Sequence, residues 1–279
     1  MNSMSFLDYT LSAEELAMAF SLVNRADLGK AVLFETFGKL SQQAIEERLK
    51  AASHSLLARK YAKIGEGGLA VLSDDVQSAL FQIIKFSGML QVVINNEEDT
   101  LMMNAHLGIR EIFTCHWVEQ GVIHRIISGT NAQLPGLITQ LVSIPQIISF
   151  GHTLQLQEGK YSIPMETFAD LPEMGVEKGL KELIKIGLPQ QLAEAFLEDL
   201  VKPKKRGSVS YIEVDSENIN KRTMDEAVAG LFFLIGKFGW ILTFPKKEKD
   251  QIGTIFPVSS EVFEKDVTQI LDKKSKAFV

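Results

Sequence analysis

The chain is poor in cysteine, since Cys115 is the sole one among 279 residues. An intrachain disulfide is therefore excluded, and folding does not require an oxidising compartment. Long apolar runs are missing as well. The longest, at residues 229–235 and 240–244, fall far short of the roughly 20 residues that span a bilayer. Residues 1–10 lack the basic and apolar regions of a signal peptide, so we expect a cytoplasmic protein with no membrane insertion.

An excess of positive charge is also absent. The chain has 29 Lys and Arg residues against 35 Asp and Glu residues, which gives a formal charge of −6. A protein of this charge is not attracted as a whole to nucleic acid or to anionic lipid. Hydrophobic residues make up 46% and charged residues 23%. These are globular proportions, and they exclude a disordered or fibrous protein.

Catalytic signatures are missing too. The sequence has no dinucleotide-binding or P-loop glycine pattern, no H-E-x-x-H and no G-x-S-x-G. Cys115 and His116 are neighbours on a predicted strand, so their side chains point to opposite faces and cannot form a thiolate–imidazole pair. His106, His116 and His124 lie on neighbouring predicted strands, and in some registers two of them share a face. None of the Cys and His spacings is that of a zinc site. We therefore predict no enzyme, no cofactor and no metal.

The N-terminal region has the outline of a winged helix. Ser12 and Glu15 form a capping box ahead of apolar residues at helical spacing. Three more helices are predicted to follow, at residues 28–37, from Ser41 onward and at residues 53–61. A glycine-turned hairpin is predicted after them, at residues 63–72. Helices followed by a small hairpin are typical of a winged-helix module.

A winged helix raises the alternative of DNA binding. Residues 53–61 would be the recognition helix, with Arg59, Lys60 and Lys63 available for phosphates. Three basic residues fall short of the roughly six to ten phosphate contacts that are usual, although a dimer doubles the number. Nucleic acid is thus not the expected partner. A winged-helix transcriptional regulator with a C-terminal sensor domain remains the alternative function.

Antiparallel strands follow in each half of the chain, and a helix closes each half. The turns between the strands are too short for parallel crossovers. In the first half the strands are predicted at residues 89–94, 100–107, 109–118 and 121–128, and the helix at 134–144. In the second half, helices at 175–186 and 189–201 precede strands at 208–214, 227–235, 238–244 and 254–257 and a helix at 261–271. The sequence thus predicts an α+β fold of two pseudo-twofold-related halves, residues 1–150 and 151–279, each an antiparallel sheet with flanking helices.

Two segments of the second half resemble a known family. Residues 240–245, Trp-Ile-Leu-Thr-Phe-Pro, are similar to its aromatic-rich strand, and residues 257–261, Pro-Val-Ser-Ser-Glu, to the entry into its last helix. With the layout above, they resemble the EspG-like chaperones of type VII (ESX) secretion systems. The resemblance implies a cytosolic, non-enzymatic chaperone or adaptor that binds a helical secreted-type client protein. It places the binding surface on the sheet, an inter-strand loop and the C-terminal helices.

A partner-binding surface is predicted in the second half. The strand at residues 227–235 is apolar on both faces, with Phe232 and Leu234 on one of them. Such a strand must be covered on both sides, either by the chain's own helices or by a partner. A basic loop at residues 202–206 precedes it. The residues predicted to bind a helical client are Lys204, Lys205, Arg206, Phe232, Leu234, Trp240 and Leu242.

Overall fold

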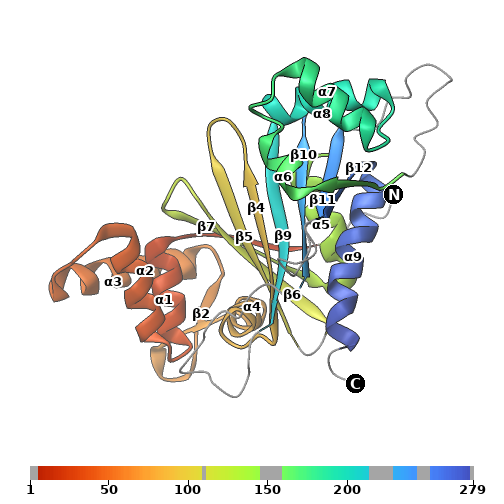
Figure 1. Cartoon of the computed structure of the whole chain (residues 1–279). Helices are drawn as coiled ribbons and strands as arrows, with labels where there is room; N and C mark the ends of the chain where they lie inside the picture. The colour runs from red at the N-terminus through yellow and green to blue at the C-terminus, as the bar shows by residue number, and fades with distance from the viewer. Residues whose placement is uncertain (1–5, 109–110, 145–158, 214–228, 244–251, 277–279) are drawn as a thin grey trace. The chain divides into compact units, whose positions relative to one another are not determined.

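The computed structural model describes residues 6–108, 111–144, 159–213, 229–243 and 252–276 (Figure 1). The fold is α+β, as predicted. Ten strands form one hydrogen-bonded sheet in the order β1-β7-β6-β5-β4-β9-β10-β11-β12-β8, and β2 and β3 form a small second sheet. Contacts divide the chain into two compact units. Unit 1 takes in the described parts of residues 1–89 and 102–133, and unit 2 those of residues 90–101, 134–213 and 224–279.

Unit 1 begins with an edge strand, followed by helices and a hairpin. In chain order these elements are β1 (Leu7–Ser12), α1 (Ala13–Leu22), α2 (Ala26–Phe37), α3 (Gln42–Ala58), β2 (Ala62–Ile64), β3 (Ala70–Leu72) and α4 (Asp74–Ile84). The meander β4 (Gly88–Asn95), β5 (Thr100–Leu107), β6 (Ile112–Glu119) and β7 (Ile123–Thr130) comes next, with most of β4 counted in unit 2. β1 pairs antiparallel with β7, the last strand of this meander.

The start of α1 confirms the predicted capping box. Ser12 Oγ accepts a hydrogen bond from the Glu15 backbone N–H at 3.1 Å, and Glu15 Oε2 accepts one from the Ser12 backbone N–H at 2.8 Å. α2 then packs very closely on α1. A Cβ atom at Gly29 would lie 2.5 Å from the carbonyl oxygen of Ala17, so this crossing requires glycine.

The helix predicted at residues 53–61 is not a separate element. α3 runs without interruption from Gln42 to Ala58, because no glycine or proline breaks the segment. It ends where Lys60 takes a φ of 62°. The hairpin after it is confirmed, with β2 and β3 joined by a turn in which Gly67 and Gly68 have φ of 79° and 78°. The three helices and the hairpin of the winged-helix outline are therefore present, without a distinct recognition helix.

From β8 onward, unit 2 repeats the order of an edge strand, three helices and a four-stranded meander, without a described counterpart of β2, β3 and α4. Its elements are α5 (Leu134–Val142), β8 (Tyr161–Pro164), α6 (Met165–Asp170), α7 (Val176–Lys185), α8 (Gln190–Val201), β9 (Lys205–Glu213), β10 (Ala229–Ile235), β11 (Gly239–Thr243), β12 (Ile252–Val258) and α9 (Ser260–Lys276). β8 pairs with β12, the last strand of its meander, just as β1 pairs with β7. A closing helix follows each meander: α5 after β7 and α9 after β12. The units differ from the predicted division at residue 150, because α5 is grouped with unit 2.

Helices cover both faces of the unit 2 strands. Phe263 of α9 meets Phe233 of β10 edge to face, with ring centroids 5.9 Å apart. On the other face, Phe196 of α8 meets Trp240 of β11 in the same manner at 5.0 Å. Figure 1 shows α7 and α8 side by side at one end of the unit 2 strands. The chain's own helices thus supply cover on both sides of β10 and β11.

Candidate docking surface

A buried carboxylate fixes α8 to the β10–β11 hairpin. Asp199 is 2% exposed, and it accepts hydrogen bonds from the backbone N–H groups of Lys237 at 2.6 Å and Phe238 at 3.1 Å. The indole Nε1–H of Trp240 donates a third at 2.8 Å. Gly236 allows this approach, because a Cβ atom there would lie 2.0 Å from Asp199 Oδ1. The hairpin is therefore locked beneath α8 by three donors and one glycine.

Three of the residues predicted to bind a partner lie inside unit 2. Leu234, Trp240 and Leu242 are 5%, 0% and 5% exposed, and they belong to one apolar cluster with Phe196 of α8. Their physical role is to pack the sheet against α8, and Asp199 holds the indole in that position. The structure brings these three residues together, but it leaves them no surface for a client.

Of the other predicted residues, Lys205, Arg206 and Phe232 lie on β9 and β10, and Lys204 directly precedes β9. The predicted loop is partly strand, since β9 begins at Lys205. Arg206 pairs with Leu234 and Ser208 with Phe232, so all four side chains lie on one face of the two strands. On this face Arg206 is exposed and the Phe232 side chain is 48% exposed. We call the surface formed by Arg206, Ser208 and Phe232 the β9–β10 face.

Lys204 and Lys205 differ in their surroundings. Lys204 is exposed, and its backbone N–H donates to the Ile235 carbonyl at 2.8 Å. Lys205 is half-buried and points to the opposite face, where its Nζ donates to the Val142 carbonyl at the end of α5 at 3.3 Å. Of the three predicted cations, Lys204 and Arg206 are thus the exposed ones, and Lys205 caps a helix.

Two histidines form a pair on unit 1. His116 Nε2 and His124 Nδ1 are 3.0 Å apart, and the rings are stacked with centroids 5.2 Å apart. His124 pairs in register with Val118, two residues along from His116, which places both rings on the same face. Burial, followed by the nearby His124 and His106, lowers the pKa of His116 to about 3, and burial also lowers the pKa of His124. Both rings are therefore neutral at pH 7, and one donates an N–H hydrogen bond to the ring nitrogen of the other.

Cys115 lies apart from the histidine pair. Cys115 lies on the opposite face of β6 from His116 and is fully buried, and burial raises the pKa of its thiol. The two side chains are thus separated by strand alternation, as predicted. In the described residues, no group of three or more His, Cys, Asp and Glu side chains is placed to hold a metal ion.

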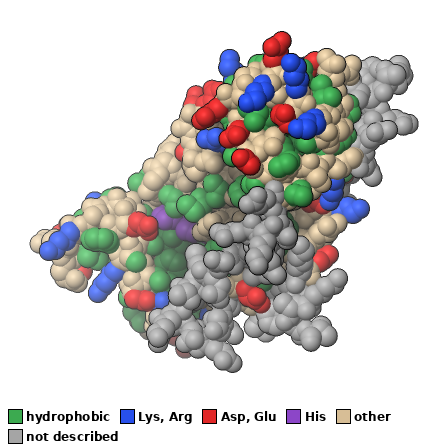
Figure 2. Space-filling model, viewed as in Figure 1, with side chains coloured by type: hydrophobic (Ala, Val, Ile, Leu, Met, Phe, Trp, Pro, Cys, Tyr) green, Lys and Arg blue, Asp and Glu red, His purple; other side chains and the backbone are tan. Residues whose placement is uncertain are grey.

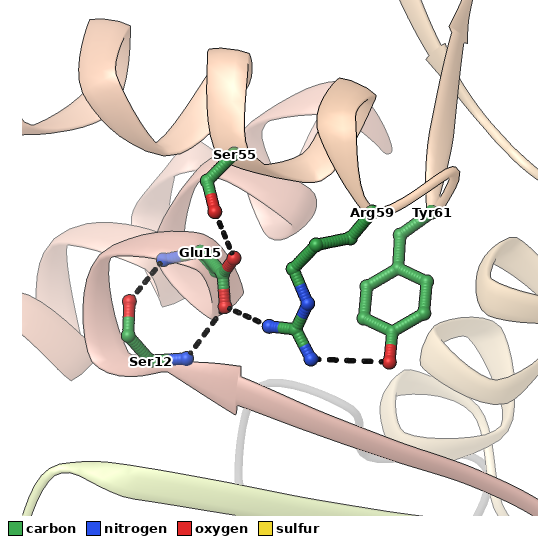
Figure 3. A network of polar contacts seen from close by, with 5 residues as sticks. All are labelled: Ser12, Glu15, Ser55, Arg59 and Tyr61. Atoms are coloured by element: carbon green, nitrogen blue, oxygen red, sulfur yellow. Dashed lines mark hydrogen bonds and ion pairs between the residues drawn. The ribbon is translucent and has the colours of Figure 1, made fainter.

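A polar network joins the helices of unit 1 (Figure 3). The carboxylate of Glu15 is 4% exposed, and it accepts hydrogen bonds from Ser55 Oγ at 2.6 Å and Arg59 Nη1 at 2.8 Å, besides the Ser12 backbone N–H. The Arg59 guanidinium also donates to the Tyr61 hydroxyl at 3.2 Å and lies over the Tyr61 ring. The buried carboxylate thus accepts from three donors, one of which is the cation Arg59, and this is the arrangement of a structural clamp.

This network bears on the DNA-binding alternative. Arg59 is one of the three cations that would contact phosphates, and its guanidinium is held by Glu15 and Tyr61. Lys60 and Lys63 remain exposed. Arg59 is exposed as well, but it is already engaged in the ion pair with Glu15, and α3 continues through residues 53–58 of the expected recognition segment. Sequence reasoning missed the network because Glu15 and Arg59 are far apart in the chain.

Comparisons with known proteins identify a shared fold. No protein-family model matches the sequence, and no curated protein matches it significantly. A solved structure of the Mycobacterium tuberculosis type VII secretion system chaperone EspG5, in complex with the PE25–PPE41 dimer, resembles the chain with a TM-score of 0.58. The match covers 95% of this chain and 96% of that one, at 10% sequence identity.

The chain thus has an EspG-like fold. The likeness extends over nearly all of both chains, and it agrees with the layout-level resemblance found from the sequence. At this level of identity it establishes the fold and leaves the client open. Within the described residues, none of the helices is both long and apolar enough to cross a membrane.

Proposed function

We propose that this protein is a non-enzymatic, cytoplasmic chaperone or adaptor that binds a helical client protein. The observation that carries the proposal is the fold shared with EspG5 over 95% of this chain. That chaperone was solved with a PE25–PPE41 dimer bound, which shows that the architecture can serve protein capture. The closed Glu15 network and the buried Cys115 are consistent with a structural rather than a catalytic use of these groups.

The β9–β10 face is the part of the predicted site that suits a client. Phe232 offers a half-exposed aromatic ring, and Arg206 is exposed on the same face. Apolar anchors of this kind typically cost about 2 kcal/mol or more of binding free energy on truncation. Charges at the rim act mainly on the association rate. We therefore assign affinity to Phe232 and selectivity for acidic clients to Lys204 and Arg206.

Co-expression with helical proteins encoded beside its gene tests this function. A client should co-elute with the chain and lose solubility without it. Phe232→Ser should weaken the complex, and Lys204→Glu with Arg206→Glu should slow its formation in a salt-dependent manner. Lys39→Glu, a charge reversal at an exposed position of unit 1, is the matched control. Failure of every neighbouring helical protein to form a complex would contradict the proposal.

A further inference from the structure

A groove opens beside α7 and α8 of unit 2. It has a volume of about 520 Å³ and is lined mainly by apolar side chains from the loop after α6 and from the two helices. Val176 at the start of α7 and Val201 at the end of α8 both line it, and they are 73% and 58% exposed. Two large apolar side chains with this much exposure, at one groove, are not needed for the core of unit 2.

The exposed apolar surface follows the spacing of a helix. Val176, Leu180 and Ile184 recur every fourth residue along α7, and Val176 and Ile184 are 73% and 43% exposed. The core face of the same helix is supplied by Leu183, which is fully buried. These residues form one apolar stripe along α7, which packs on the core of unit 2 at Leu180 and Leu183 and reaches solvent at Val176 and Ile184. The exposed parts of this stripe extend beyond what the helix needs for packing on its own unit.

The charges at the groove are arranged for a cation. Glu194 and Glu198 line it from α8, are exposed, and stand four residues apart, where like charges repel each other. Gln190 donates a hydrogen bond to Glu194, which leaves the charge in place. Among the residues that the structure describes, neither carboxylate forms an ion pair, and Lys202 lies at the end of the groove. Figure 2 shows acidic, basic and apolar side chains interspersed over α7 and α8.

We propose that this α7–α8 groove binds an amphipathic helical segment of a partner protein that carries a Lys or Arg. The segment would insert apolar side chains between Val176 and Val201 and place its cation against Glu194 and Glu198. A groove between two helices commonly binds a third helix, which inserts apolar side chains that are one helical turn apart. The two carboxylates disfavour nucleic acid and anionic lipid as occupants.

The α7–α8 groove would add a second contact to the proposed function, with a charge preference opposite to that of the β9–β10 face. The β9–β10 face selects acidic side chains, whereas the α7–α8 groove selects basic ones. This proposal rests on the proposed function in one respect, that the occupant is a protein segment. Its test uses peptides and needs no client, so the two proposals can fail separately.

Two labelled peptides that form helices test the groove. Each has about 12–15 residues, the length at which an isolated helix becomes marginally stable, and two leucines one turn apart. They differ in one pair of side chains, lysine in one peptide and glutamate in the other. Binding to the full chain is measured by fluorescence anisotropy. We expect the lysine peptide to bind about tenfold more tightly, the effect of a charge-assisted hydrogen bond.

Variants of the groove complete the experiment. Glu194→Lys with Glu198→Lys should reverse the preference, and Val176→Ser with Val201→Ser should weaken both peptides. Glu46→Lys with Glu47→Lys, exposed on α3, is the matched control and should leave both affinities unchanged. Circular dichroism checks that each variant is folded. Equal binding of the two peptides, or a preference that survives the charge reversal, would overturn the groove assignment even if client capture is observed.

Discussion

The indole Nε1–H of Trp240 donates a hydrogen bond to Asp199 Oδ2 at 2.8 Å, in a part of unit 2 where both side chains are buried. Asp199 also accepts the backbone N–H groups of Lys237 and Phe238. One carboxylate thus satisfies three donors, and its hydrogen bonds with Phe238 and Trp240 are buried.

We expect Asp199→Ala to destabilise the protein severely. Each buried donor left without an acceptor costs about 1–3 kcal/mol, so the loss in the free energy of unfolding should reach about 3 kcal/mol or more. Urea unfolding, followed by tryptophan fluorescence, measures it. Glu198→Ala, an exposed change on the same helix, should stay within about 0.5 kcal/mol. Similar effects of the two substitutions would show that Asp199 is not the anchor.

Gly236→Ala should be almost as damaging as Asp199→Ala. The added Cβ atom would lie 2.0 Å from Asp199 Oδ1, so either the hairpin or α8 must move. The double variant is informative, since alanine at position 199 removes the contacts with Oδ1 and Cγ and leaves only the mildest of the three, with Cβ at 2.9 Å. We expect the two losses of unfolding free energy to be clearly less than additive. Additive losses would contradict a direct contact between the two positions.

Acid should destabilise unit 1 through its histidine pair. The folded pKa of His116 is lowered to about 3, below its ordinary value of 6.5. The folded state therefore binds fewer protons than the unfolded state, and this part of the stability is present above pH 6.5 and is lost as the pH falls toward 3. The slope is at most about 1.4 kcal/mol per pH unit for each histidine.

Replacement of both histidines tests this dependence. The free energy of unfolding of His116→Gln with His124→Gln should fall less steeply between pH 6.5 and 4 than that of the parent chain. His54→Gln, in α3 and away from the pair in sequence, serves as the control for loss of a histidine. Parallel pH profiles for the parent and the double variant would rule out the pair as the cause.

The thiol of Cys115 should be inert in the folded protein. It is fully buried, and burial raises its pKa, so the reactive thiolate is scarce. A thiol reagent should modify it after denaturation and not before. Cys115→Ala should leave client capture intact, because the side chain faces away from His116. Loss of capture in a folded Cys115→Ala variant would contradict the non-enzymatic proposal.

Specific binding to duplex DNA is not expected at physiological salt. Arg59 is committed to Glu15 and Tyr61, and Lys60 and Lys63 are too few for a phosphate-contacting surface. Anisotropy with labelled duplexes from the promoters near the gene measures this. Nanomolar binding that disappears with Lys60→Ala and Lys63→Ala would favour the regulator alternative.

Local signals in the sequence predicted the elements that depend on neighbours in the chain. The Ser12–Glu15 capping box marks the start of α1, and the short turns between β4 and β7 fix an antiparallel meander. The edge strands β1 and β8 were missed, because their partners β7 and β12 are distant in sequence. The sequence predicts a connecting segment with some extended structure at residues 151–161, and β8, which begins at Tyr161, is too short to show a periodic pattern.

The site was harder to predict than the fold. The sequence predicts a helix at residues 189–201, but not that this helix lies over Trp240 and Leu242 and covers them. Leu180, Leu183 and Ile184 read as one apolar stripe, whereas α7 divides them between the core and the solvent. Whether an apolar residue faces a partner or its own core depends on which helix lies over the strand, and that is a tertiary property.

The pairing of β1 with β7 has a consequence for synthesis on the ribosome. The paired residues are separated by 111 positions, from Ser12 to Ile123, up to 121 positions, from Leu7 to Ser128. At roughly 5–20 residues per second, β1 emerges on the order of ten seconds before its partner exists. Its backbone groups stay unpaired during that interval, and the late contact raises the contact order of the fold. The N-terminal helices therefore lie beside an incomplete sheet until β7 is synthesised. Because β1 is unpaired in that interval, the nascent chain is most vulnerable to aggregation before residue 128 is added.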